Sequence, residues 1–180
     1  MTINILVEIP KGSHNKYEVD EESGRIKLDR VLHGATHFPF EYGSVENTRG
    51  EDGDPLDVVL LSSAPTFPGC TVKAELIGYL EMEDEGGIDH KMIAVPVAKI
   101  DPRWSHIREI SDLQEHSRAE IKDFFEIYKR LEPGKWVKTK EFKPRKEDTR
   151  KRSKKIHKLV WRRKRSFCET RRAPSGIKRE

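Results

Sequence analysis

Cysteine is scarce in this sequence of 180 residues, and long apolar runs are missing. The two cysteines, Cys70 and Cys168, are far apart and form no zinc-binding or redox motif. No segment approaches the roughly 20 consecutive apolar residues that a membrane-spanning helix needs. The first residues also lack the basic region and apolar core of a secretory leader. The sequence therefore excludes a disulfide scaffold and a membrane protein, and it predicts a cytoplasmic location.

Charged residues are abundant, at 37% of the chain, but the two signs are unevenly distributed. Residues 138–180 contain 19 Lys and Arg against 5 Asp and Glu, a net charge of +14. Residues 1–137 contain 16 against 26, a net charge of −10. The pattern predicts one folded domain at residues 1–138 and a basic, poorly ordered tail at residues 139–180.

The most unusual segment is the acidic run at residues 52–58, Asp-Gly-Asp-Pro-Leu-Asp-Val. Gly53 and Pro55 favour a turn, and the apolar residues 58–61 that follow predict a buried strand. Carboxylates this close repel one another unless they share a positive charge. Because oxygen ligands suit hard cations such as Mg²⁺, Mn²⁺ or Ca²⁺ better than zinc, the segment predicts a metal site. The alternative is an acidic turn that only faces solvent.

Short segments with β-branched or alternating apolar residues predict a small β-barrel. Strands are expected at residues 5–9, 16–20, 25–32, 58–61, 70–74, 76–80 and 92–97. The aromatic segment 37–43 is expected to be a packed loop. Residues 82–91 are expected to be a loop that carries four acids.

One helix is predicted late in the chain. Ser111 and Gln114 resemble a capping box, apolar residues then recur at helical spacing, and Pro133-Gly134 would end the helix. Tyr128 and Lys129 would lie near its C-terminal end. They either serve a site or are a core tyrosine and a lysine that complements the helix dipole.

Charged side chains gather near the ends of the predicted strands. The acids are Glu8, Glu18, Asp52, Asp54, Asp57, Asp84, Glu85 and Asp89, and the cations are Lys16, Arg30, Lys91 and Lys129. Arg30 is notable because it is charged where its strand pattern predicts an apolar residue. Acids can bind divalent metals, and metals together with Lys and Arg can hold phosphate oxygens. The mixture predicts phosphoryl-transfer chemistry.

Taken in order, these motifs resemble the soluble family I inorganic pyrophosphatases of bacteria and archaea. The resemblance runs from about Leu6 to Val137, and the acidic run at 52–58 is its most specific part. It implies a mainly β fold with flanking α-helices, in which helices pack outside a five-stranded OB-like β-barrel. It also implies hydrolysis of diphosphate to two phosphates by a metal-activated water, in a homo-oligomer, commonly a hexamer.

The resemblance assigns a role to each matched position. The metal ligands, for several Mg²⁺ or alternatively Mn²⁺ ions, would be Asp52, Asp57, Asp84 and Asp89. Supporting acids would be Glu8, Glu18 and Glu85. The substrate diphosphate would be bound by Lys16, Arg30, Tyr42, Lys91, Tyr128 and Lys129. Asp54 would be the catalytic base that takes a proton from the attacking water.

Three features depart from the family pattern. The usual lead-in before the first strand is expected to be absent, which would leave an edge exposed. Phe38 replaces a usual tyrosine, so a hydroxyl near the phosphates is expected to be missing. Residues 139–180 replace an amphipathic C-terminal helix with basic runs. This tail is either an extension that contacts nucleic acid, polyphosphate or another acidic surface, or a translated frameshift without a selected function.

A different class of protein is the alternative for the whole chain. An OB-like barrel with a basic tail could be a module that binds single-stranded nucleic acid. The net charge of −10 on residues 1–137 argues against it, because a nucleic-acid groove needs cations where these loops carry acids.

Overall fold

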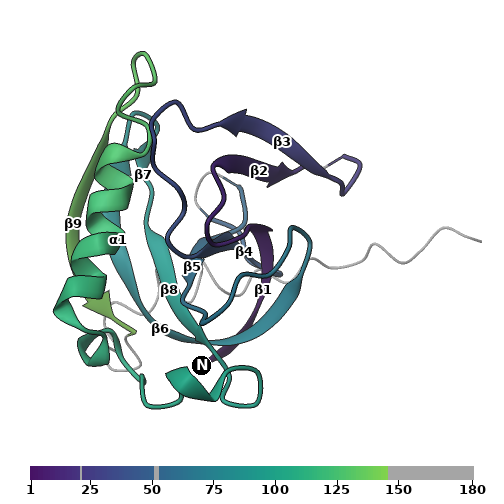
Figure 1. Cartoon of the computed structure of the whole chain (residues 1–180), viewed down its shortest axis with the longest axis vertical. Helices are drawn as coiled ribbons and strands as arrows, with labels where there is room; N and C mark the ends of the chain where they lie inside the picture. The colour runs from purple at the N-terminus through teal and green to yellow at the C-terminus, as the bar shows by residue number, and fades with distance from the viewer. Residues whose placement is uncertain (21, 51–52, 146–180) are drawn as a thin grey trace, which may run out of the picture.

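The computed structural model describes residues 1–20, 22–50 and 53–145, and within them the fold is mainly β (Figure 1). The strands are β1 (Thr2–Ile9), β2 (Asn15–Val19), β3 (Ile26–Val31), β4 (Glu41–Val45), β5 (Asp57–Leu60), β6 (Thr71–Asp84), β7 (Gly87–Ile88), β8 (Lys91–Pro96) and β9 (Val137–Pro144). The helices are α1 (Glu115–Ile127) and the short 3-10 helices η1 (Pro102–Trp104) and η2 (Ile110–Asp112). Five of the predicted strands are confirmed, as β1, β2, β3, β5 and β8.

Five strands close into a barrel in the order β1, β4, β5, β8, β6 and back to β1. All neighbours are antiparallel except β5 and β8, which run parallel. The predicted five-stranded barrel is therefore confirmed. β2 and β3 form a separate two-stranded sheet that projects beside the barrel, and α1 lies along β9 (Figure 1).

β6 is one strand of 14 residues, whereas two short strands were expected at 70–74 and 76–80. Its beginning pairs with β1 and its end with β9, while β8 pairs along the opposite edge. The register with β8 shifts between Leu76 and Gly78. A side chain at Gly78 would come within 2.6 Å of the Lys143 carbonyl oxygen, so this glycine allows β9 to approach. The boundary that the sequence predicted between two short strands is the place where β6 changes its pairing partner from β1 to β9.

The segment 37–43 is only partly the loop that the sequence predicted, because Glu41 already begins β4. β4 pairs with β1 on one side and with β5 on the other. Gly43 lies where β1 comes closest, and a Cβ atom built there would be 2.0 Å from the Leu6 carbonyl oxygen. The aromatic and charged residues of this segment do not show a strand pattern. β4 nevertheless forms, because Gly43 lets β1 and β4 pack closely.

The prediction of a capping box at Ser111 and Gln114 is wrong. The capping box lies in η2, where Glu109 and Asp112 exchange side-chain and backbone hydrogen bonds. Gln114 precedes α1 without capping it through its side chain, and α1 ends at Ile127, before the expected proline stop. Ser111 belongs to η2, the short 3-10 helix that precedes α1. The sequence prediction therefore assigned the capping motif to the wrong helix.

β9 crosses the expected domain boundary at residue 138, so residues 139–144 belong to the sheet. Two of its lysines neutralise acids of β6: Lys140 pairs with Glu83, and the Lys143 Nζ lies 3.6 Å from a Glu81 carboxylate oxygen. This start of the basic region has a structural use in cross-strand pairing. The prediction of a poorly ordered tail otherwise concerns residues 146–180, which lie outside the described part.

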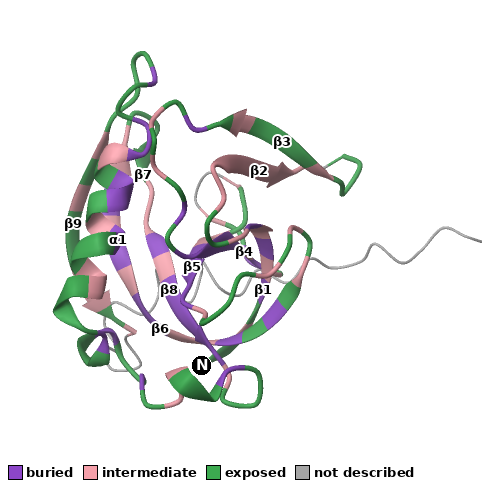
Figure 2. Ribbon diagram, in the orientation of Figure 1, coloured by how far each residue is buried: buried purple, intermediate pink, exposed green. Residues whose placement is uncertain are grey.

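Buried apolar residues lie along the barrel strands and on the inner face of α1 (Figure 2). Between α1 and the barrel lies an aromatic cluster of Phe38, Phe40, Phe124 and Phe125, with neighbouring ring centroids 4.8–6.5 Å apart. Such pairs add to the stabilisation from burial. The cluster fixes the end of α1, where Tyr128 follows.

A buried carboxylate outside the acidic segment also organises the fold. Glu41 is fully buried and accepts hydrogen bonds from the Lys11 backbone N–H at 3.1 Å, the Thr66 N–H at 3.0 Å and the Thr66 Oγ1 at 2.5 Å. These bonds connect two loops to β4. Glu41 therefore replaces water as the partner of both loops.

We expect Glu41→Ala to lower the free energy of unfolding by about 3 kcal/mol, because hydrogen bonds to a charged group contribute about 1.5–3 kcal/mol each and do not add fully. Urea unfolding measures the change. Glu41→Gln is the matched control, and it should cost less because one side-chain oxygen remains as an acceptor. Equal stability of Glu41→Ala and the parent chain would show that the hydrogen bonds of Glu41 to the two loops do not stabilise the fold.

Candidate active site

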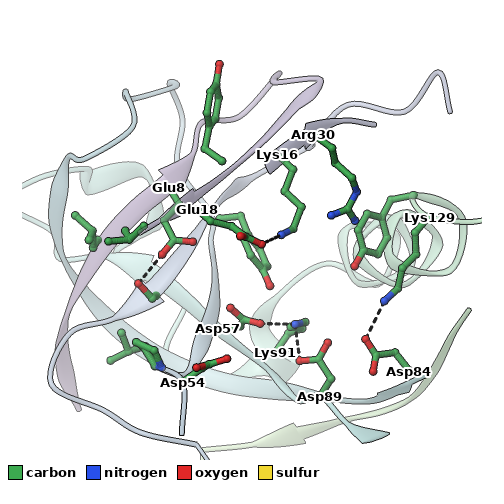
Figure 3. A pocket seen from close by; sticks show the side chains of 18 of the residues that line it. Glu8, Lys16, Glu18, Arg30, Asp54, Asp57, Asp84, Asp89, Lys91 and Lys129 are labelled. Atoms are coloured by element: carbon green, nitrogen blue, oxygen red, sulfur yellow. Dashed lines mark hydrogen bonds and ion pairs between the residues drawn. The ribbon is translucent and has the colours of Figure 1, made fainter. Parts of the chain in front are cut away.

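A pocket of about 870 Å³ opens between the β2–β3 hairpin, the barrel and the end of α1 (Figure 3). Its lining contains every candidate residue predicted from the sequence that the structure describes. These are Glu8, Lys16, Glu18, Arg30, Tyr42, Asp54, Asp57, Asp84, Glu85, Asp89, Lys91, Tyr128 and Lys129. Asp52 lies outside the described residues. Side chains from distant parts of the chain therefore converge on one cavity.

The described part of the acidic segment, residues 53–58, bends in front of β5 as predicted. Gly53 has a φ angle of +101°, a conformation that favours glycine, and Asp57 is the first residue of β5. The buried Thr48 anchors the turn, because its Oγ1 accepts the Leu56 N–H at 3.0 Å. Sequence reasoning missed Thr48, which carries no charge to mark it. Asp54 and Asp57 both line the pocket from this turn.

Lys91 connects two of the acids at the centre of the pocket. Its Nζ lies 2.5 Å from an Asp57 oxygen and 2.6 Å from an Asp89 oxygen, and its side chain is 4% exposed. Burial by itself lowers the pKa of Lys91, but the two carboxylates outweigh it and hold that pKa above its usual value. Burial raises the pKa of Asp89 although Lys91 opposes the shift. Lys91 is thus a fixed positive charge between two acids.

A second group of charges lies where β6 ends and α1 finishes. The Lys129 Nζ contacts Asp84 at 2.8 Å and Glu85 at 3.2 Å, and the Lys135 Nζ contacts Glu85 at 2.7 Å. Burial works to raise the pKa of Glu85, but hydrogen bonds, led by that from Lys135, lower it to about 2. Glu85 is therefore ionised at neutral pH. Lys135 lines the pocket and was not among the predicted residues.

The β2–β3 hairpin supplies the remaining cations. The Lys16 Nζ contacts Glu18 and, at 3.2 Å, Asp29. The Arg30 Nε donates to Glu132 Oε1 at 2.9 Å, and Arg30 also pairs with Asp29. The charge of Arg30 in a strand pattern that favoured an apolar residue is explained by these contacts and by its place in the pocket. Glu132 and Asp29, which orient the hairpin cations, were missed.

Glu8 and Tyr42, which line the pocket, have raised pKa values that favour their neutral forms. Burial, with a smaller contribution from the charge of Asp57, raises the pKa of Glu8 to about 7, although the Ser44 hydroxyl donates to it at 2.9 Å. Burial and the charges of Asp57 and Asp89 also raise the pKa of Tyr42. Glu8 therefore titrates near neutral pH and lies in the pocket lining.

The donor chemistry of the pocket fits a hard divalent cation. The lining described above presents carboxylate oxygens from Asp54, Asp57, Asp84 and Asp89, and it includes no Cys or His. In the part of the chain that the structure describes, no three Asp, Glu, His or Cys side chains are already grouped as a metal site. The ammonium groups of Lys91 and Lys129 lie against these acids instead. A bound cation would share carboxylates that now pair with lysines.

A barrel whose pocket combines carboxylates, ammonium groups and a guanidinium belongs to the class of enzymes that act on phosphate groups with the help of a divalent metal. A sequence model described as inorganic pyrophosphatase matches residues 5–160. The chain belongs to the inorganic pyrophosphatase family.

Individual relatives agree with this assignment. The inorganic pyrophosphatase of Streptomyces coelicolor is 54% identical over 137 residues, which cover 76% of this chain and 83% of the relative. The solved structure of the Helicobacter pylori inorganic pyrophosphatase has a TM-score of 0.81 at 48% identity and covers 88% of this chain and 91% of that chain. The Thermus thermophilus structure gives 0.81 at 43% identity, with 88% and 89% covered.

These comparisons confirm the family resemblance, the OB-like fold class and the prediction of an enzyme of the inorganic diphosphatase class. They give no support to the alternative of a nucleic-acid-binding module. Membership of the family implies a divalent metal cofactor in general. Among the described residues, α1 and the two 3-10 helices are too short or too polar to cross a membrane.

Phe38, the departure from the family pattern, lies in the aromatic core. The residue is 2% exposed, and its ring centroid lies 4.8 Å from that of Phe124 and 5.8 Å from that of Tyr42. Phe38 is not among the pocket-lining residues. The expected loss of a phosphate contact is therefore not supported by this position. Tyr42, which lines the pocket, is the neighbour through which Phe38 contacts the site.

We expect Phe38→Tyr to change the rate of phosphate release by less than about threefold and to lower the free energy of unfolding by about 1–2 kcal/mol, because the new hydroxyl would be buried. Steady-state kinetics and urea unfolding measure the two effects. Phe40→Tyr, in the same cluster, is the control for a buried hydroxyl alone. A large gain in rate for Phe38→Tyr only would show that its hydroxyl reaches the phosphates.

Proposed function

We propose that this chain hydrolyses inorganic diphosphate to two phosphates, with Mg²⁺ as its metal and Mn²⁺ as an alternative. The observation that carries the proposal is the convergence of four cations, Lys16, Arg30, Lys91 and Lys129, with a wall of carboxylates in one pocket. Diphosphate is small and highly charged, so it needs cations on several sides. The pocket supplies this arrangement.

The cationic side chains are proposed to bind and orient the substrate. Lys16 and Arg30 on the hairpin, and Lys129 after α1, would contact phosphate oxygens from different sides of the cavity. The raised pKa of Lys91 keeps its charge at neutral pH. Tyr42 and Tyr128, whose pKa values are raised by burial, keep their protons and can donate hydrogen bonds. This positioning supplies most of what phosphoryl transfer needs from a protein.

The carboxylates are proposed to hold the metal and to move a proton. Asp57, Asp84 and Asp89, together with Asp52, would be the metal ligands, and Glu8, Glu18 and Glu85 would support them. When bound, Mg²⁺ supplies charge neutralisation and makes water a usable nucleophile near neutral pH. The Asp54 carboxylate would accept the proton of the attacking water, because it lines the pocket from the same turn as Asp57.

Phosphate release from diphosphate should require Mg²⁺ and should be abolished by an excess of EDTA. Adding Mg²⁺ beyond the chelator should restore the rate, which separates metal removal from denaturation. A colorimetric phosphate assay on the purified chain measures the reaction, with heat-inactivated protein as the control for contaminating phosphate. Full activity in EDTA would overturn the proposed role of the metal.

The assembly is proposed from the family resemblance, and the location from the two widely separated cysteines, which form no disulfide framework. A homo-oligomer, with a hexamer as the favoured form, would be located in the cytoplasm.

A further inference from the structure

Two histidines lie close together outside the pocket. The ring centroids of His14 and His37 are 4.7 Å apart, with an angle of 40° between the ring planes. Neither residue is among those that line the active-site pocket. The diphosphatase chemistry therefore does not account for this pair.

In a neutral imidazole, the hydrogen-bond partner identifies the ring nitrogen that carries the proton. His14 Nε2 lies 2.8 Å from the Gly34 carbonyl oxygen, and His37 Nδ1 lies 3.2 Å from the Ala35 carbonyl oxygen. Because a carbonyl oxygen only accepts, each of these nitrogens must be the donor. The lone pairs are then on His14 Nδ1 and His37 Nε2. An imidazole that donates its other N–H to a backbone carbonyl is the usual arrangement of a metal-binding histidine.

The backbone around the two rings is already fixed. The His14 carbonyl accepts the Leu32 N–H at 2.9 Å, the Ser13 carbonyl accepts the Phe38 N–H at 2.9 Å, and the Gly12 N–H donates to the Phe38 carbonyl at 2.7 Å. These bonds connect the segment 12–14 to both ends of the loop 32–38. A ligand that contacts both rings would find their backbones positioned before it binds.

The same loop contains an oxygen whose hydrogen-bonding capacity is not used. Thr36 Oγ1 is buried and has no hydrogen-bond partner among the described residues. Buried hydroxyl groups are normally satisfied, so each exception needs an explanation. The Thr36 hydroxyl, in the loop that carries His37, can therefore still form a hydrogen bond with a ligand or with a water bound to that ligand.

We propose that His14 and His37 form a two-imidazole site for a borderline divalent metal such as Zn²⁺, separate from the carboxylate pocket. With Zn–N distances of about 2.0–2.1 Å, two imidazoles on one ion have ring centroids roughly 4.5–5.2 Å apart for angles of about 90–110° at the metal. The observed separation of 4.7 Å lies in this range. Water completes the coordination, and the hard carboxylates of the pocket select a different metal.

The test is a Zn²⁺ titration of the whole chain in excess Mg²⁺, followed by long-range proton–nitrogen NMR of the imidazoles. Excess Mg²⁺ competes for the carboxylates, and the spectrum reports each histidine separately. We expect the ring signals of His14 and His37 to shift together, with the bound nitrogens being His14 Nδ1 and His37 Nε2. The melting temperature should also rise with Zn²⁺, since the ion joins two segments.

Variants make the assignment specific. His37→Ala changes an exposed residue and should remove both the Zn²⁺-induced shift of the His14 signals and the rise in melting temperature. Phosphate release with Mg²⁺ should stay unchanged, which would show that the variant is folded. His14→Gln should do the same. His106→Ala, at an exposed histidine elsewhere, is the control and should keep the response. Unchanged His14 and His37 signals under Zn²⁺, or an intact response in His37→Ala, would overturn the proposal.

Discussion

Asp57→Asn is expected to lower the rate of Mg²⁺-dependent phosphate release by about 10²-fold or more. Asp57 lines the pocket at the start of β5, and one of its oxygens lies 2.5 Å from the Lys91 Nζ. The amide keeps the size of the side chain but removes the negative charge that would hold a metal and fix Lys91. Loss of one preorganised electrostatic contact typically costs about 10²–10³ in rate.

The measurement is the turnover rate across a range of Mg²⁺ concentrations. Asp123→Asn is the matched control, because Asp123 is an exposed aspartate on α1 outside the pocket lining, and its loss should leave the rate unchanged. Asp54→Asn adds a second comparison: it should reduce the rate without the increased Mg²⁺ requirement expected of Asp57→Asn. A normal rate in Asp57→Asn would contradict the assignment of this residue to the metal.

Gly43→Ala is expected to destabilise the fold by more than about 4 kcal/mol, a loss large enough to prevent a stable barrel. The added Cβ atom would lie 2.0 Å from the Leu6 carbonyl oxygen and 2.9 Å from the Val7 Cα. These are backbone atoms of β1, which cannot move aside as a flexible side chain could. Relief requires that β1 and β4 separate, and both are barrel strands.

Circular dichroism and chemical unfolding of the purified variant measure this effect. Gly34→Ala is the control, because a Cβ atom there meets only the Thr36 Oγ1, at an ordinary distance of 3.8 Å. It should change the free energy of unfolding by less than about 1 kcal/mol. A Gly43→Ala chain that unfolds like the parent would show that the β1–β4 pairing is looser than the structure indicates.

The sequence predicted the site better than the boundaries of the elements. Carboxylates such as Asp57 and Asp89 could be found because a charge beside an apolar strand is costly and needs a reason. Arg30 was identified by the same argument. The partner switch of β6 and the strand character of Glu41 depend on neighbours far away in the chain, which no local pattern records. The capping motif failed because Ser111 had an alternative local structure, the turn of η2.

Positioning residues were harder to find than the residues they position. Thr48 holds the acidic turn by one hydroxyl, and Glu132 reaches Arg30 across 102 positions of sequence. A hydroxyl or a single acid of this kind looks like any surface residue until the fold brings its partner near. Lys135 was overlooked because it lies in a turn between α1 and β9 without a pattern of its own.

The position of Lys91 between Asp57 and Asp89 has a consequence for how far the folding of this protein depends on metal. Small zinc domains stay unfolded until their ion binds, because metal binding supplies their free energy of folding. Here Lys91 and Lys129 already neutralise part of the acidic wall. The barrel should therefore depend less on its metal for folding than such zinc domains do, and metal depletion should lower the rate more than the free energy of unfolding.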